Sequence, residues 1–88
     1  MDFDWNDANV EHIARHGIVP QEAEDAVRIE PLEADVQQHE GESRVLCFGR
    51  TKSGRLLSVL YTVRQGRIRV LTAYQITKRQ QQSYFKGR

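Results

Sequence analysis

Five side chains in this sequence are suited to acid–base chemistry at a phosphate group. His16 and Tyr74 can accept or donate a proton, and Arg69, Lys78 and Arg79 are cations that can bracket a phosphate. Such a reaction needs a base to activate an attacking hydroxyl, cations to stabilise the developing negative charge, and an acid for the leaving oxygen. The sequence therefore offers four candidate catalytic residues: His16, Arg69, Tyr74 and Arg79.

Some of these residues also have a purely structural interpretation. His16 precedes a glycine at a predicted helix end, where a histidine often binds the last carbonyls of the helix. Tyr84 and Phe85 are more typical of helix packing than of a platform for stacking bases. Lys78 and Arg79 differ, because positive charge in the first turn of a helix is unfavourable and its presence there indicates a function.

A metal site is a weaker alternative. His12 and His16 are four residues apart, so both imidazoles lie on one face of a helix, and His39 offers a third nitrogen. The sequence has no pair of cysteines and no zinc motif with a glutamate to support this site. A phosphate loop and a nucleophile elbow are also lacking. We therefore expect no metal ion and no other cofactor.

The charges are divided unevenly along the chain. Residues 1–42 carry all 12 acidic side chains and two basic ones, whereas residues 43–88 carry 11 basic side chains and no acidic one. This asymmetry has two interpretations of equal weight. The basic half contacts nucleic acid or an acidic partner, or acidic helices neutralise a basic sheet within the molecule. On the first interpretation we predict contacts with RNA from six residues: Arg15, Arg50, Arg55, Arg64, Lys78 and Tyr84.

The length of 88 residues predicts one domain with a small core. Cys47 is the only cysteine and follows apolar neighbours, which predicts a buried thiol and fits a reducing compartment. No apolar stretch reaches the ~20 residues of a membrane span, and the acidic N-terminus is unlike a signal peptide. We expect a soluble, cytoplasmic protein.

The N-terminal third predicts two short helices. Asn6 is a good N-cap for a helix over Asp7–His16, with Trp5 placed to fix its start and Gly17 to end it. Pro20 suits the first turn of a second helix, which stops before Pro31. The capping box that starts at Thr77 predicts a last helix.

Between these helices the sequence alternates as strands do. The predicted strands are Leu32–Gln37, Arg44–Arg50, Leu56–Val63 and Arg67–Gln75, with hairpins at Gly54 and Gly66. Strict alternation in the last strand puts Arg69 on the face opposite Tyr74, unless a bulge intervenes. The resulting prediction is a single α+β domain over residues 1–88, with two N-terminal helices, an antiparallel meander of about four strands and a C-terminal helix. Residues 3–5 add a short edge strand.

Three groups of residues occur in a fixed order along nearly the whole chain: Trp5 with Arg15-His16-Gly17 and Pro20-Gln21-Glu22-Ala23; Phe48-Gly49-Arg50 with Gly54-Arg55 and Tyr61-Thr62-Val63-Arg64; and Ile68-Arg69-Val70-Leu71-Thr72-Ala73 with Lys78-Arg79 and Tyr84. This pattern resembles the BrnT-like toxins of bacterial type II toxin–antitoxin systems. The resemblance implies a RelE-like fold, metal-independent endoribonuclease activity on messenger RNA, and neutralisation by a DNA-binding antitoxin. A hetero-oligomer with a dimeric antitoxin is the expected assembly.

The chain departs from the family pattern at four positions. Tyr74 stands where an arginine is usual, Gln80 where a glutamate is usual, and Asn9 and His12 where a lysine and an asparagine are common. Each change removes or moves a functional group. A toxin with ribonuclease activity is the first hypothesis, and a non-catalytic module of the same fold that binds nucleic acid or protein is the alternative.

Overall fold

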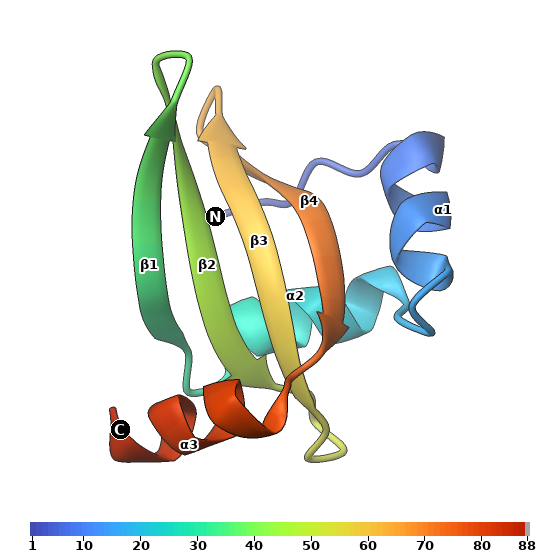
Figure 1. Cartoon of the computed structure of the whole chain (residues 1–88). Coiled ribbons are helices and arrows are strands. Elements are labelled where there is room, and N and C mark those ends of the chain that lie inside the picture. Colours follow the sequence, from blue (N-terminus) through green and yellow to red (C-terminus); the bar gives the residue numbers. More distant parts are fainter. Residues whose placement is uncertain (88) are drawn as a thin grey trace.

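The computed structural model describes residues 1–87, in which an antiparallel sheet of four strands is flanked by three helices (Figure 1). The helices are α1 (Asp7–Ala14), α2 (Pro20–Arg28) and α3 (Lys78–Lys86), and the strands are β1 (Leu32–His39), β2 (Glu42–Arg50), β3 (Leu56–Arg64) and β4 (Arg67–Gln75). The strands lie side by side in chain order. The predicted α+β fold, with its order of elements, is confirmed.

Local capping signals set the helix ends. The Asn6 side chain accepts a hydrogen bond from the Asn9 backbone N–H, as expected for an N-cap, and Gly17 adopts the left-handed conformation with φ of 74°. α1 ends at Ala14, two residues earlier than predicted, and a turn follows it. Pro20 is the first residue of α2, as predicted.

The hairpins follow the predicted turn chemistry. Gln65 and Gly66 both have positive φ, which matches the right-handed twist of the two strands that they join. Glu40 and Gly41 form an equivalent loop between β1 and β2. The first two strands are longer than predicted: β1 continues to His39, and β2 begins at Glu42.

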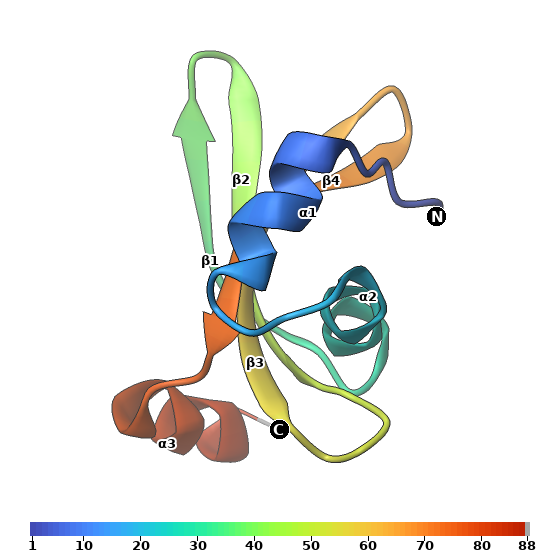
Figure 2. The same cartoon turned by 90° about the vertical axis from the view of Figure 1, so that its right-hand side faces the viewer.

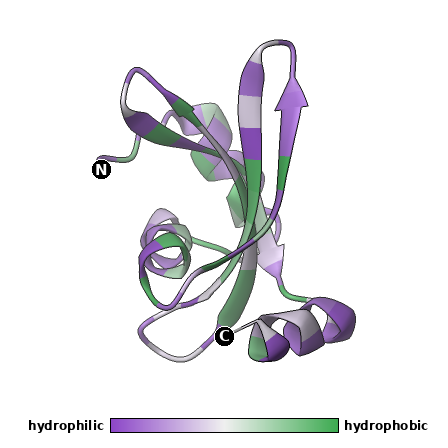
Figure 3. Cartoon of the chain, turned by 90° about the vertical axis from the view of Figure 1, so that its left-hand side faces the viewer, coloured by the Kyte–Doolittle hydropathy of each residue, from purple (hydrophilic) through white to green (hydrophobic). Residues whose placement is uncertain are grey.

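The hydrophobic core lies between the sheet and α2, on the side that we call the back face (Figure 2). α3 lies on the opposite side, the front face, and α1 lies beside β4 at the edge of the sheet (Figures 1 and 2). β1, on the other edge, is mostly exposed and largely hydrophilic (Figure 3). The buried core consists of Ile13, Ile18, Ala23, Ala26, Cys47, Leu57, Val59, Tyr61, Ile68, Val70 and Ala73.

A β-bulge interrupts the pairing of β3 with β4. Leu60 pairs with Thr72, but the next residue of β3, Tyr61, pairs with Val70. Leu71 is thus the extra residue, and the alternation of side chains along β4 is inverted across it. Val70 before the bulge and Ala73 after it both reach the back-face core. An unbroken alternation would have sent these two residues to opposite faces.

The bulge changes which side chains of β4 can act together. Arg69 pairs with Thr62, and Tyr74 pairs with Ser58. Thr62 and Ser58 are four residues apart on one strand, and paired residues of neighbouring strands point to the same face. Arg69 and Tyr74 therefore share the front face. The prediction from strict alternation, which put them on opposite faces, is wrong, and its alternative with a bulge in the last strand is confirmed.

The N-terminal segment extends the sheet beyond β4. Phe3 forms a parallel bridge with Ile68, and the Asp4 N–H donates to the Ile68 carbonyl over 2.8 Å. The predicted edge strand is thus present as a single bridge. Trp5 is half-buried against the core, where its ring stacks on Phe3 and its indole N–H donates to Glu24. None of the helices described over residues 1–87 is long and apolar enough to cross a membrane.

Candidate active site

His12 of α1 and His16 of the turn after it face the end of β4. The ring of His16 lies 6.4 Å from that of Tyr74 and 5.7 Å from that of His12, both in edge-to-face contacts. His12 Nε2 is 3.1 Å from Thr72 Oγ1, which links this helix to the edge strand. Because α1 packs against β4, the last turn of the helix and the turn after it bring two imidazoles to the phenol of Tyr74.

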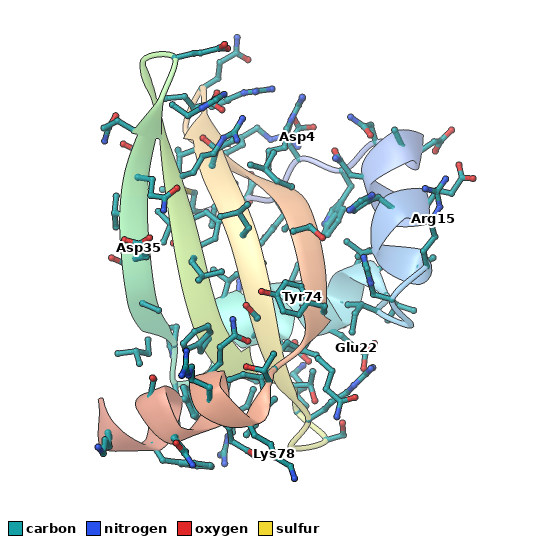
Figure 4. All side chains as sticks on the ribbon, in the orientation of Figure 1. Asp4, Arg15, Glu22, Asp35, Tyr74 and Lys78 are labelled. Atoms are coloured by element: carbon teal, nitrogen blue, oxygen red, sulfur yellow. The ribbon has the colours of Figure 1, made fainter. Side chains whose placement is uncertain are left out.

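The phenol is held from its other side by α3. Gln80 completes the capping box at Thr77, where its Oε1 accepts from the Thr77 backbone N–H over 3.1 Å. The amide nitrogen of Gln80 donates to the Tyr74 hydroxyl over 3.3 Å. Since the hydroxyl oxygen is the acceptor in this bond, its own proton remains available for donation. Tyr74 is half-buried and lies on the face of the sheet that is turned toward the viewer in Figure 4.

Arg69 lies on the same face but further along the strand. Arg69 pairs with Thr62 and Tyr74 pairs with Ser58, and these two partners are four residues apart on β3. Arg69 and Tyr74 are therefore separated by about 13 Å along the strands. One guanidinium nitrogen of Arg69, Nη2, donates to Asp4 Oδ2 over 2.8 Å. This hydrogen bond from Arg69 is the main reason that the pKa of Asp4 lies below its ordinary value.

The first turn of α3 carries two exposed cations. Lys78 and Arg79 form no ion pair with any residue in the part of the chain that the structure describes. Lys78 lies on the side of α3 away from Tyr74 (Figure 4). Arg79 directly precedes Gln80, the residue that holds Tyr74. Of the two, Arg79 is therefore nearer in sequence to the residue that holds the phenol.

Three of the arginines predicted to contact RNA are bound to acidic side chains. Arg55 lies 3.2 Å from Glu22 and also donates to the Gly17 carbonyl, so it ties the α1–α2 turn to the β2–β3 loop. Arg50 and Arg64 pair with Glu30 and Glu42, at 3.6 and 2.7 Å. Of the six ion pairs among residues 1–87, five join a base from the second half of the chain to an acid from the first half. Much of the charge asymmetry is thus neutralised internally.

The remaining predicted contact residues are Arg15 and Tyr84. Arg15 is exposed on the outer side of α1 and has no ion pair within the described residues (Figure 4). Tyr84 has no exposed surface, and its hydroxyl donates to the Glu30 carbonyl over 2.9 Å. In this position Tyr84 anchors α3 to the sheet and cannot stack on a base, so we correct its predicted role to a packing role.

The structure does not assemble the three-histidine metal site. His39 lies at the end of β1, whereas His12 and His16 lie beyond β4, on the other side of the four strands. No group of three or more His, Cys, Asp or Glu side chains within residues 1–87 could hold a metal ion. The two histidines that remain close contact Thr72 and Tyr74 instead.

Some residues of this region were not singled out as site residues from the sequence. His12 was considered as a metal ligand and as a departure from the family pattern, although its spacing from His16 already implied a shared helix face. Thr72 and Arg44 are not predicted from the sequence to be site residues. Their positions depend on the bulge in β4 and on the pairing of distant strands.

Comparison with known proteins identifies one family. The family described as "Ribonuclease toxin, BrnT, of type II toxin-antitoxin system" matches residues 5–80, which include α1, α2, all four strands and the start of α3. A comparison with curated proteins finds no match.

Proposed function

We propose that this chain, which belongs to the BrnT family of ribonuclease toxins of type II toxin–antitoxin systems, cleaves messenger RNA without a metal ion and uses His16 and Tyr74 to transfer protons. The observation that supports this best is the contact of the two rings at 6.4 Å on an open face of the sheet. The two rings are in contact, so a substrate would lie across their edges and could reach a proton-transfer group of each.

The proposed reaction is attack by a ribose 2′-oxygen on the adjacent phosphorus. His16 removes the proton of the 2′-hydroxyl, a new P–O2′ bond forms, and the P–O5′ bond breaks. Tyr74 donates its hydroxyl proton to the leaving O5′, with its oxygen oriented by Gln80. The products are a 2′,3′-cyclic phosphate and a free 5′-hydroxyl, and the proton held by His16 returns to Tyr74 through solvent.

Cations stabilise the charge that grows on the phosphate oxygens. We assign this role at the scissile phosphate to Arg79, because it is exposed, unpaired and next to Gln80. Arg69, which we predicted to hold the same phosphate, is about 13 Å further along the strands. We therefore propose that Arg69 binds a neighbouring phosphate of the same RNA strand.

The type II toxin family implies a cognate antitoxin as partner. We propose that a dimeric, DNA-binding antitoxin neutralises this chain in a hetero-oligomer. Growth of a bacterial host that expresses the chain alone, compared with one that also expresses the neighbouring reading frame, tests this partner. Restored growth together with co-purification of both chains is the expected result.

A non-catalytic module of the same fold is the second candidate. It is favoured by the uncharged Gln80, which cannot exchange protons, and by the Asp4 carboxylate that already occupies Arg69. In this case the front face would bind nucleic acid or protein without cutting it.

The deciding experiment measures cleavage of a messenger RNA by the purified protein in the presence of EDTA. We expect cleavage with a 2′,3′-cyclic phosphate end, and we expect His16→Ala and Tyr74→Phe each to slow it at least about a hundredfold. His39→Ala is the matched control, because this histidine lies on the opposite edge strand and should leave the rate unchanged.

Substitution of the two arginines completes the test. Arg79→Ala should slow cleavage by two to three decades, roughly 3 to 4 kcal/mol in the barrier, and should melt within a few degrees of the parent because its side chain is exposed. If the parent leaves RNA intact under all conditions, the binding module is correct. If the parent cuts RNA and neither His16→Ala nor Tyr74→Phe affects the rate, the active site lies elsewhere.

A further inference from the structure

We propose that Arg44 and Arg69, on either side of Thr62, form a second phosphate-binding subsite on the front face. This inference rests on the proposed function, because it takes the ligand to be the backbone of a single RNA strand. Arg44 was not among the residues predicted to contact RNA, and its position in the fold assigns this role.

The three residues form one row across the sheet. Arg44 of β2 pairs with Thr62 of β3, and Thr62 pairs with Arg69 of β4. Directly paired residues point to the same face, so both guanidinium groups are on the front face. Two strand spacings separate the Cα atoms of the two arginines by roughly 10 Å.

The short side chain between the arginines forms the floor of this row. Thr62 has no exposed surface, and its hydroxyl donates to the Ser43 carbonyl over 2.8 Å. Its hydroxyl proton is thus already used, and the groups left to bind an anion are the flanking guanidiniums. Phosphate is a preferred ligand of paired guanidinium groups because several N–H donors converge on its oxygens.

Hydrogen-bonding capacity remains unused on both arginines. Within residues 1–87 the Arg44 side chain has no hydrogen bond and no ion pair, and the Nε atoms of both Arg44 and Arg69 are buried without a partner. Arg55 and Arg64, in contrast, are held by carboxylates. A buried Nε cannot be reached from solvent, so the donors left to bind an anion are the Nη groups of Arg44 and the Nη donors of Arg69 that Asp4 does not use.

Two carboxylates border the row, and both are already bound. Asp4 accepts a hydrogen bond from Nη2 of Arg69, and Glu42 accepts one from Arg64 over 2.7 Å. The positive charge of Arg44 also contributes to the lowered pKa of Glu42. A guanidinium has five N–H donors, so the bond to Asp4 leaves others free on Arg69. Asp4 thus positions Arg69 and limits its mobility without consuming all of its donors.

The row cannot contact the phosphate on which His16 and Tyr74 are proposed to act. It is about 13 Å from the Tyr74 row along the strands, which is further than neighbouring reacting groups can be. It is suited instead to a phosphate elsewhere on the same strand of RNA. The subsite should therefore matter for long substrates and be irrelevant to a substrate with a single phosphate.

The experiment compares Arg44→Gln with Lys52→Gln in the full-length protein. Both variants remove one positive charge that has no ion pair, but Lys52 lies in the β2–β3 loop, away from the row. Binding is measured with a 2′-O-methyl RNA oligonucleotide that spans the face and cannot be cleaved through its 2′-oxygen. Cleavage is measured on the unmodified oligonucleotide and on a dinucleoside monophosphate.

We expect Arg44→Gln to weaken binding about tenfold and to reduce the log–log salt slope by about 0.7, the contribution of one phosphate. For cleavage of the long RNA, KM should rise and kcat/KM should fall by the same factor of about ten. Cleavage of the dinucleoside monophosphate should be unchanged. Lys52→Gln should change the affinity less than twofold.

Equal affinities and equal salt slopes for Arg44→Gln and the parent would overturn the subsite, even if the parent cuts RNA. An equal loss on the dinucleoside substrate would also overturn it, because it would place Arg44 at the reaction centre. Arg44-dependent binding in a parent that does not cleave would instead sustain the subsite and reject only the proposed cleavage.

Discussion

The closest backbone contact between α2 and the sheet predicts a large effect of a single methyl group. Gly49 of β2 lies against the backbone of Ala26, and a Cβ atom at position 49 would collide with the Ala26 carbonyl oxygen and lie 2.6 Å from its carbonyl carbon and 2.9 Å from its Cα. Non-bonded carbon atoms prefer separations of about 3.5 to 4.0 Å. Gly49→Ala therefore forces the helix and the strand apart by roughly 1 Å or more.

The size of this effect follows from the lack of any flexible group at the contact. Gly49 has no positive φ, so alanine fits its backbone conformation, and in open space the change would stabilise a strand by about 0.5 to 1 kcal/mol. Overpacking against a rigid core costs about 1 to 3 kcal/mol and occasionally more, and we expect the upper end, because the clash is with backbone. For a domain of this size, 3 kcal/mol lowers the Tm by roughly 12 to 24 °C.

The assay is thermal unfolding followed by near-ultraviolet circular dichroism. Gly54→Ala serves as control, because its Cβ would meet no neighbour and the cost is confined to a φ of 90°, about 1 to 2 kcal/mol. A Gly49→Ala protein that melts at or above the Tm of the parent would refute the close packing of α2 on β2.

Three further predictions concern the fold. Trp5→Ala should lower the free energy of unfolding by about 2 to 3 kcal/mol, since the packing of the half-buried indole and its hydrogen bond to Glu24 are lost. Urea unfolding measures this loss. A fluorescence spectrum of Trp5 in the parent like that of free indole in water would contradict it. The pKa values of Asp4 and Glu42 are lowered chiefly by hydrogen bonds from Arg69 and Arg64, below ordinary values of 3.8 and 4.5. The two carboxylates therefore stabilise the folded protein fully above about pH 4.5, and this stabilisation is lost as the pH falls through their lowered pKa values in the folded protein. The double variant Asp4→Asn, Glu42→Gln should make the free energy of unfolding depend less on pH below about pH 4.5. An unchanged pH dependence would argue against both ion pairs. Burial raises the pKa of the Cys47 thiol to about 11, so alkylation at neutral pH should proceed only as fast as the protein opens, and rapid labelling of the native protein would contradict its burial.

The parts of the fold that sequence predicted depend on neighbours in the chain. A cap such as Asn6 or Thr77 acts within three residues, and the conformation of Gly17 or Gly66 is set by its own backbone. These signals fixed the type and order of the helices and strands. They left the ends uncertain by one to a few residues, because the last turn of α1 and the tips of β1 and β2 depend on contacts with other elements.

The candidate site depends on contacts between distant segments, and for this reason it was only partly predictable. His16 and Tyr74 were recognised as proton-transfer groups from their chemistry, but their proximity requires α1 to pack beside β4. The partners of Arg55 and Arg64 are more than 20 residues away, so composition alone could not distinguish a free cation from a neutralised one.

Arg44 illustrates the same limit in the opposite direction. In the sequence it is one of 11 basic residues in the second half of the chain, with nothing to set it apart. The pairing of three strands places it in a row with Arg69, and the bulge at Leu71 puts that row on the face that also carries Tyr74. Because the bulge absorbs only the extra residue Leu71, its deletion should restore regular pairing, in which Arg69 and Tyr74 are four residues apart and remain on the front face. Cleavage of RNA by the deletion variant should therefore persist, and loss of cleavage in a variant whose circular dichroism matches the parent would contradict this register.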